Sequence, residues 1–77
     1  MAAVRFFAAA AEAAGTDALS VDAATLGELK TQLVQRMPAL AALLDRCAVL
    51  VDGSRVGDEH PLTGVGTIDV LPPFAGG

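Results

Sequence analysis

Residues 25–38, TLGELKTQLVQRMP, contain the clearest structural signal in this 77-residue chain. Thr25 and Glu28 form a capping-box pattern, in which the Thr25 hydroxyl bonds the Glu28 amide and Glu28 reaches back to the start of a helix. Pro38 ends this helix, because the residue before a proline disfavours helical dihedral angles. Apolar residues recur along it at helical spacing, so that one stripe contains Leu26, Leu29, Leu33 and Met37.

Two segments before this helix alternate between apolar and polar residues, which is typical of strands. Residues 18–22 (ALSVD) and residues 3–8 (AVRFFA) are predicted to pair as an antiparallel hairpin. The Ala-rich segment between them fits one helical turn that Gly15 ends. The first strand is expected to place its side chains on two faces, Val4, Phe6 and Ala8 on one and Arg5 and Phe7 on the other.

After the helix, residues 38–46 (PALAALLDR) predict a short helical turn, and residues 47–51 (CAVLV) predict a buried strand closed by a turn at 52–54. A further short strand can form near Val56. Residues 67–71 (TIDVL) alternate again, with Ile68 and Val70 opposite Leu71. The predicted order is β-β-α-β-β, and a helix with one apolar stripe covers one face of a mixed sheet.

The other face of this sheet has no second helix to cover it. If the first and last strands are neighbours, Phe7 and Leu71 form an exposed apolar patch beside the end of the chain. Such patches commonly mark a binding surface. The alternative is that a loop or the turn at 38–44 covers both side chains.

Composition excludes several function classes. One domain of this length has a small core and little room for a deep catalytic cleft. The net charge is −4 and the five basic residues are scattered along the sequence, which argues against nucleic-acid binding and favours a basic protein partner. No run of about 18–20 apolar residues is present, and Arg5 and Glu12 interrupt the pattern of a signal peptide, so the expected location is the cytoplasm.

Residue types that usually carry catalysis or bind metals are scarce. Cys47 lies in an apolar run, is expected to be a core residue, and as the single cysteine forms no internal disulfide, which indicates a reducing compartment. Asp58, Glu59 and His60 are adjacent in sequence, a spacing that rarely converges on one ion, and His60 is expected to be a turn residue. Neither a metal site nor a bound cofactor is predicted.

The sequence ends in LPPFAGG, residues 71–77. Pro72 and Pro73 are expected to end the last strand and to direct the tail outward. Gly76 and Gly77 have no side chains and can thread a narrow channel in another protein. The reactive group is then the carboxylate of Gly77, which a partner enzyme must activate, for example as an acyl-adenylate. The alternative is a frayed terminus without a role.

Over essentially its whole length the chain resembles the small subunit of molybdopterin synthase, the MoaD group of the MoaD/ThiS sulfur carriers. The segments that carry the resemblance are VRFFAAAAEAAGTD at 4–17 and VLVDGSRVGDEHPLTGVGTIDVLPPFAGG at 49–77, above all the Pro-Pro-x-x-Gly-Gly end. The resemblance implies an α+β, ubiquitin-like β-grasp domain in residues 1–71, with four to five strands covered on one face by one main helix. Residues 72–77 are then a flexible C-terminal tail.

The resemblance also implies a function. An E1-like enzyme uses ATP to adenylate Gly77, a sulfurtransferase donor supplies sulfur for a thiocarboxylate, and the tail enters the large synthase subunit, where the sulfur builds the dithiolene of molybdopterin. Gly76 and Gly77 carry this function, and the chain has no active site of its own. Two small and two large subunits are expected to form a heterotetramer. The expected partner-binding residues are Phe7, Leu71, Pro72, Pro73, Phe74 and Ala75.

This sequence departs from the family pattern at two places. Residues 63–66, Thr-Gly-Val-Gly, replace an Asp-Gly-Asp turn, and the first loop is all Ala where relatives often have a basic residue. Three other functions stay open: sulfur delivery to thiamine, cysteine or tRNA thiolation; a ubiquitin-like modifier joined to lysines through Gly77; and a plain interaction domain. The Pro-Pro pair favours the molybdopterin branch.

Overall fold

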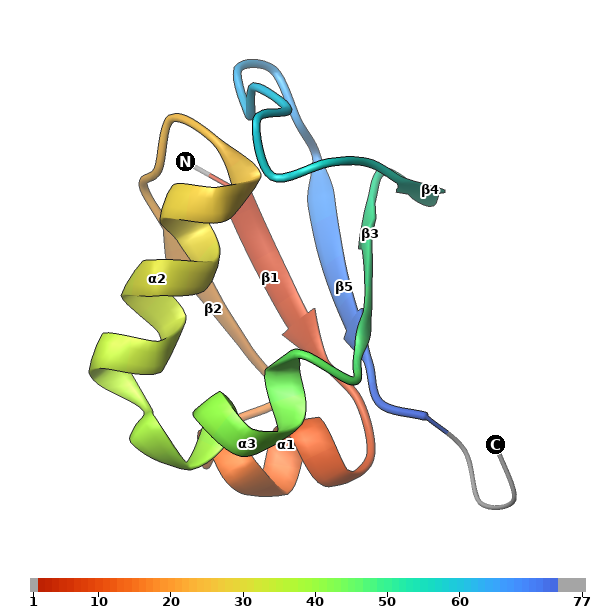
Figure 1. Ribbon diagram of the computed structural model, residues 1–77. Coiled ribbons are helices and arrows are strands. Elements are labelled where there is room, and N and C mark those ends of the chain that lie inside the picture. The colour runs from red at the N-terminus through yellow and green to blue at the C-terminus, as the bar shows by residue number, and fades with distance from the viewer. Residues whose placement is uncertain (1, 74–77) are drawn as a thin grey trace.

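Five strands form one mixed sheet in the order β2-β1-β5-β3-β4 in the computed structural model, which describes residues 2–73 (Figure 1). β1 and β5 are central neighbours and pair in parallel, whereas the other pairs are antiparallel. The first and last strands therefore lie side by side, as the predicted patch requires. The strands are β1 (Ala2–Phe6), β2 (Ala18–Val21), β3 (Ala48–Val51), β4 (Ser54–Arg55) and β5 (Thr67–Leu71).

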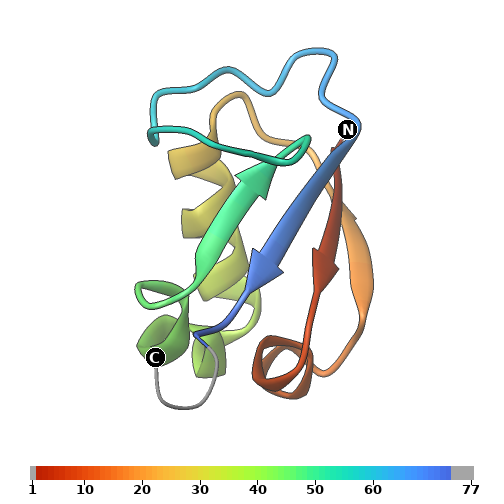
Figure 2. The ribbon, with the colours of Figure 1, turned by 90° about the vertical axis from the view of Figure 1, so that its right-hand side faces the viewer.

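The helices leave one face of the sheet open. The main helix, α2 (Leu26–Arg36), lies across the other face, while α1 (Ala9–Ala14), the 3-10 turn η1 (Pro38–Leu40) and α3 (Ala41–Leu44) lie at the end of the sheet where β5 stops (Figures 1 and 2). This arrangement confirms the predicted α+β, β-grasp fold. Within residues 2–73 no helix has the length and apolar content needed to cross a membrane.

The core lies between α2 and the inner face of the sheet. Leu26, Leu29 and Leu33 of α2 are fully buried, as the predicted stripe requires, whereas Met37 follows the helix and is only half-buried. No buried polar or charged residue occurs within residues 2–73, so apolar packing alone fills this layer. The buried residues that face α2 from the three inner strands are Val4, Phe6, Val49, Val51, Ile68 and Val70.

One local prediction is wrong. β1 ends at Phe6, and Ala8 is exposed instead of facing the core, because its backbone (φ 50°, ψ −125°) turns the chain into α1. The difference at Ala8 arises at a chain reversal, where local geometry outweighs side-chain periodicity. The predicted capping contacts of α2 are confirmed: the Thr25 Oγ1 accepts from the Glu28 N–H at 3.3 Å, and the Glu28 carboxylate reaches back to accept from the Ala24 N–H at 3.3 Å.

Backbone carbonyl groups of the segment after β4 satisfy the first N–H groups of α2. Leu26 donates to the carbonyl of His60 at 3.1 Å, and Gly27 donates to the carbonyl of Asp58 at 2.8 Å. These N–H groups have no partner within the helix itself. The approach is close: a Cβ at position 27 would lie 3.1 Å from the Asp58 Cβ and 3.2 Å from the Asp58 carbonyl oxygen. Gly27 therefore avoids a tight contact with Asp58 at this point of the helix.

The turn between β3 and β4 is tied to the start of β5. Asp52 and Gly53 have φ angles of 48° and 86°, which fits a tight hairpin turn. The Asp52 carboxylate accepts from the N–H of Gly66 at 3.0 Å and from the N–H of Thr67 at 2.9 Å. These hydrogen bonds, first from Thr67 and then from Gly66, lower the pKa of Asp52 below its ordinary value of 3.8. Asp52 thus holds the end of the 63–66 turn, in which no acidic residue occurs.

The first prediction concerns Gly27. Alanine favours a helix over glycine by about 1 kcal/mol, but overpacking a tight contact costs about 1–3 kcal/mol. We expect Gly27→Ala to lower the free energy of unfolding by about 1 kcal/mol, measured by urea denaturation. The exposed Gln35→Ala on the same helix should be neutral or slightly stabilising. A Gly27→Ala protein as stable as the wild type would show that the contact with Asp58 adapts without cost.

The second prediction concerns Asp52 and pH. In the unfolded chain this carboxyl titrates near its ordinary pKa of 3.8, and in the folded chain it titrates lower. Its stabilising effect is therefore complete above the unfolded pKa and is lost as the pH falls through the lower folded pKa. Asp52→Asn should lower the thermal midpoint at pH 7, and its difference from wild type should shrink below about pH 4. Asp22→Asn is the control, and an equal effect there would contradict this role of Asp52.

Candidate protein-binding face

The open face of the sheet carries a row of side chains that crosses four strands. Arg5 of β1 pairs with Asp69 of β5, Asp69 pairs with Leu50 of β3, and Leu50 pairs with Arg55 of β4. Directly paired residues project from the same face of a sheet. The face that the helices leave uncovered (Figure 2) therefore has an ion-pairing centre and a basic residue at its β4 edge.

A second row, nearer to the end of β5, is apolar. Leu71 pairs with Ala48, and the Phe7 N–H donates to the Val70 carbonyl at 3.2 Å, which continues the β1–β5 ladder beyond Phe6. Phe7 is 38% exposed and is the large hydrophobic residue that stands out to solvent within residues 2–73, whereas Leu71 is half-buried. The structure thus brings Phe7 and Leu71 together on the open face, as the alternation of the two strands predicted.

Arg5 joins the two rows. Its Nε and Nη2 atoms donate to the two carboxylate oxygens of Asp69 at 2.7 and 2.9 Å, and its Cζ lies 5.7 Å from the centre of the Phe7 ring. The hydrogen bond to Asp69 and the charge of Asp69 raise the pKa of Arg5. Exposed ion pairs add little stability. The consequence is geometric: the two-point contact holds the guanidinium beside the Phe7 ring, within the range of a cation–π interaction.

Ala8 fixes the corner that presents Phe7. Its φ of 50° with ψ of −125° lies in a region that residues with a Cβ rarely adopt. The N–H of Ala10 donates to the Phe7 carbonyl at 3.0 Å, and the N–H of Ala11 donates to the Ala8 carbonyl at 3.0 Å. The first turn of α1 therefore holds Phe7 and Ala8 in place. Sequence reasoning missed this role, because nothing in an Ala-rich run marks a residue with positive φ.

The last strand leads directly into the tail. β5 ends at Leu71, Pro72 is buried and Pro73 is exposed. Pro72, expected from the resemblance to bind a partner, therefore lies within the fold and fixes the point where the tail begins, while Pro73 is accessible. The other expected tail residues, Phe74, Ala75, Gly76 and Gly77, lie outside the described residues.

The candidate catalytic groups do not converge. Cys47 is buried, its thiol lies 3.3 Å from the Leu43 carbonyl, and burial raises the pKa of the thiol, as expected for a core cysteine. His60 is half-buried and contributes its backbone carbonyl to the start of α2. No group of three or more metal-ligating side chains occurs in the part of the chain that the structure describes.

One surface depression, of about 640 Å³, lies between residues 22–24, Glu28 and residues 62–65. Its ionisable groups are the carboxylates of Asp22 and Glu28, and Glu28 is engaged in capping the Ala24 N–H. The lining also includes the Thr63 hydroxyl, but no histidine, cysteine, lysine or arginine. Its polar side chains are therefore two carboxylates and one hydroxyl.

Comparisons with known proteins agree with this fold. SAMP1 from Haloferax volcanii is 29% identical, with a TM-score of 0.83 over 97% of each chain. Subunit 1 in the complex of molybdopterin-converting factor subunits 1 and 2 from Helicobacter pylori is 28% identical, with a TM-score of 0.72 over 99% of this chain and 97% of that one. A putative molybdopterin converting factor subunit 1 from Pyrococcus furiosus shares the fold, with a TM-score of 0.84. It is 21% identical, and the match covers 95% of this chain and 97% of that one.

A search of curated protein sequences finds no match. A family match is nevertheless clear, because the sequence model of the ThiS family aligns with residues 4–77, from the second half of β1 through the terminal glycines. That alignment includes both the open sheet face and the Gly-Gly end, and with it we conclude that the chain belongs to the ThiS family.

Proposed function

We propose that this protein is a sulfur carrier that delivers sulfur to the large subunit of molybdopterin synthase for dithiolene formation. The observation that carries the proposal is the ThiS family match through residue 77, together with the Pro-Pro-x-x-Gly-Gly end. The named partner is supported by the 28% identity to a subunit that was solved in complex with the second subunit of molybdopterin-converting factor.

The chemistry takes place at the carboxylate of Gly77. A carboxylate is a poor electrophile, so an E1-like partner enzyme transfers AMP from ATP to it and releases pyrophosphate. A sulfur atom at the oxidation level of hydrosulfide, supplied by a sulfurtransferase donor, then displaces AMP and leaves a thiocarboxylate. ATP is bound by the activating enzyme, and the carrier contributes the acyl group and its delivery.

The open face explains how a partner finds this group. Phe7 and Leu71 lie on the face at the end where β5 stops, and Pro72 is buried directly after Leu71. A partner that covers these side chains therefore meets the start of the tail at a defined place. Because Gly76 and Gly77 lack side chains, the end of the tail fits a narrow channel. With the large subunit, we infer a heterotetramer of two copies of each chain.

A second candidate function is that of a ubiquitin-like protein modifier. The observation in its favour is the similarity to SAMP1, a structure that is also described as small archaeal modifier protein 1. Adenylation of Gly77 would be the same, but the acyl group would end as an amide on a lysine of another protein. Carriers for thiamine, cysteine or tRNA thiolation share the thiocarboxylate and differ in the acceptor.

The third prediction tests the carrier chemistry. The purified protein, incubated with the adenylating enzyme of the same organism, ATP and a sulfur donor, should gain the mass of one oxygen-to-sulfur exchange at Gly77, measured by intact-protein mass spectrometry. Gly76→Ala should fold normally but react more slowly, because a Cβ narrows the fit in the channel.

A chain lacking Gly77 is the control and should not acquire this mass. An unchanged wild-type mass would contradict the carrier proposal. If the wild type instead forms heavier conjugates with other proteins, seen on a denaturing gel, the modifier function is correct. Equal rates for wild type and Gly76→Ala would overturn the steric argument alone.

A further inference from the structure

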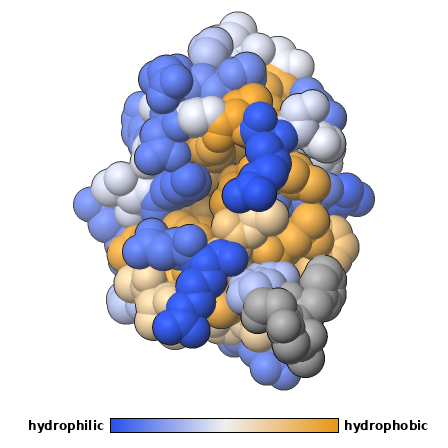
Figure 3. Space-filling view, turned by 45° about the vertical axis from the view of Figure 1, so that its right-hand side comes forward, coloured by the Kyte–Doolittle hydropathy of each residue, from blue (hydrophilic) through white to orange (hydrophobic). Residues whose placement is uncertain are grey.

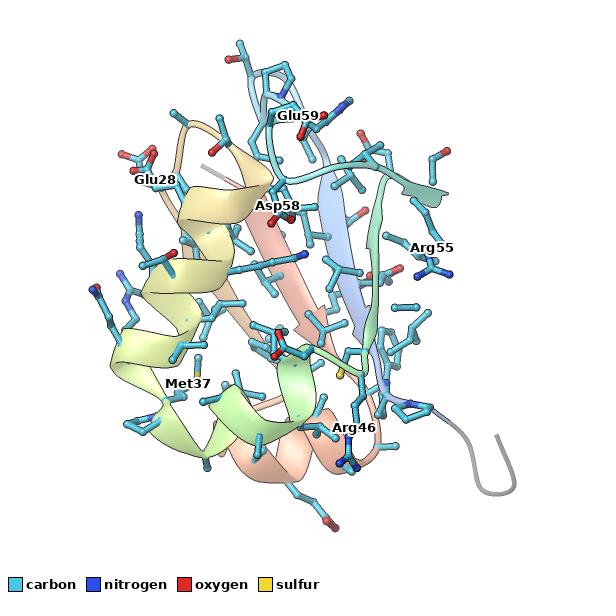
Figure 4. All side chains as sticks on the ribbon, viewed as in Figure 1. Glu28, Met37, Arg46, Arg55, Asp58 and Glu59 are labelled. Carbon is cyan, nitrogen blue, oxygen red and sulfur yellow. The ribbon has the colours of Figure 1, made fainter. Side chains whose placement is uncertain are left out.

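Basic residues gather at one side of the open face, although the whole chain has a net charge of −4. Arg55 lies at the β4 end of the row described above and is exposed. Arg46 is exposed in the connection between α3 and β3, two residues before Ala48, which pairs with Leu71 at the end of β5. Figure 4 shows Arg55 beyond the edge of β3 and Arg46 below the start of β3, toward the end of the sheet where the tail begins.

Two acidic residues of the neighbouring strand β5 and of the β3–β4 turn are engaged elsewhere. Asp69 is bound by both donors of Arg5, and the Asp52 carboxylate accepts from the backbone at residues 66 and 67. Asp45 lines a groove on the helix side of the molecule, with α2 and α3. Within residues 2–73 the ion pairs are Arg5–Asp69 and Lys30–Asp58, so neither Arg46 nor Arg55 has one there.

The opposite edge of the same face has the opposite charge. Asp17, the exposed residue directly before β2, lines a depression together with Arg5, Phe7 and Ala18. The face is therefore polarised: a carboxylate lies at the β2 edge, a neutral ion pair lies at the centre, and two guanidinium groups lie toward β4 and the start of the tail. Figure 3 shows strongly hydrophilic side chains that lie across an apolar surface on this side of the molecule.

We propose that the protein that docks on this face has acidic side chains opposite Arg46 and Arg55. This inference rests on the proposed function, because the partner in question is the adenylating enzyme that activates the tail. A partner that covers Leu50 and Leu71 also removes water from the neighbouring guanidinium groups, and such burial is unfavourable unless acceptors replace the water. Carboxylates are the matching acceptors, because the planar guanidinium binds them with two parallel hydrogen bonds.

This arrangement also sets the orientation of docking. An acidic partner surface is attracted to the β4 side and repelled by Asp17 at the β2 side, so the reversed orientation is disfavoured. The net charge of −4 alone predicts a basic partner. The position of the charges on the face predicts instead that the contacted surface of the partner is acidic. The two alternatives differ in whether loss of an arginine slows or speeds association.

The fourth prediction uses the adenylating enzyme of the same organism as the probe. Association rate constants are measured by stopped-flow fluorescence, at low and at high salt, for wild type, Arg46→Gln, Arg55→Gln and the double variant. Arg36→Gln is the matched control, because it removes the same charge from α2. Loss of either face arginine should slow association at low salt by about 3–10-fold, with a smaller difference at high salt. Unchanged thermal midpoints would show that the variants fold.

Three results would overturn the inference in distinguishable ways. Faster association of Arg46→Gln and Arg55→Gln than of wild type would mean that the contacted surface is basic. Rates equal to that of Arg36→Gln would mean that these arginines face no charge, and the proposed function would survive both results. Absence of binding by the wild-type protein would overturn the proposed function itself, and this inference with it.

Discussion

The parallel pairing of β1 with β5 is the constraint on which the rest of the structure depends. It joins residues 64 positions apart in the chain, as in the contact between Arg5 and Asp69. On the inner face it places Val4 beside Ile68 and Phe6 beside Val70, and α2 covers these side chains. On the outer face it creates the row with the ion pair and the apolar row beside the tail. A shift of the register by one residue would exchange these two faces.

The two faces of the sheet therefore serve different purposes. The inner face stabilises the fold by apolar burial, and the loop carbonyls at the start of α2 remove the unsatisfied donors that would otherwise weaken the helix. The outer face does not contribute to this core. On it, the backbone conformation of Ala8 positions Phe7, and the guanidinium of Arg5 lies beside the Phe7 ring. A chain of this size has one core, and here it lies on the inner face of the sheet.

Much of this arrangement could be predicted from periodicity. The stripe of α2 and the alternation in β1 and β5 assign Phe7, Leu71, Arg5 and Asp69 to one face. Periodicity predicts neither the hydrogen bonds from the backbone N–H groups of residues 66 and 67 to the Asp52 carboxylate nor the positive φ of Ala8. Net charge sums over the chain and omits position, so it does not give the charge distribution of one face. Of the expected site residues, Phe74–Gly77 lie outside the described part, and their roles stay predictions.

The most direct test of the central claim, that the open face beside the tail is the partner-binding surface, is the affinity of Phe7→Asp for the adenylating enzyme. Ala42→Asp, which adds the same charge at an exposed position of α3, is the control. We predict that Phe7→Asp folds with the wild-type thermal midpoint and binds on the order of tenfold or more weakly, as for a central apolar contact, while Ala42→Asp binds normally. Equal affinity of Phe7→Asp and wild type would contradict the account, and loss of folding would place Phe7 in the core.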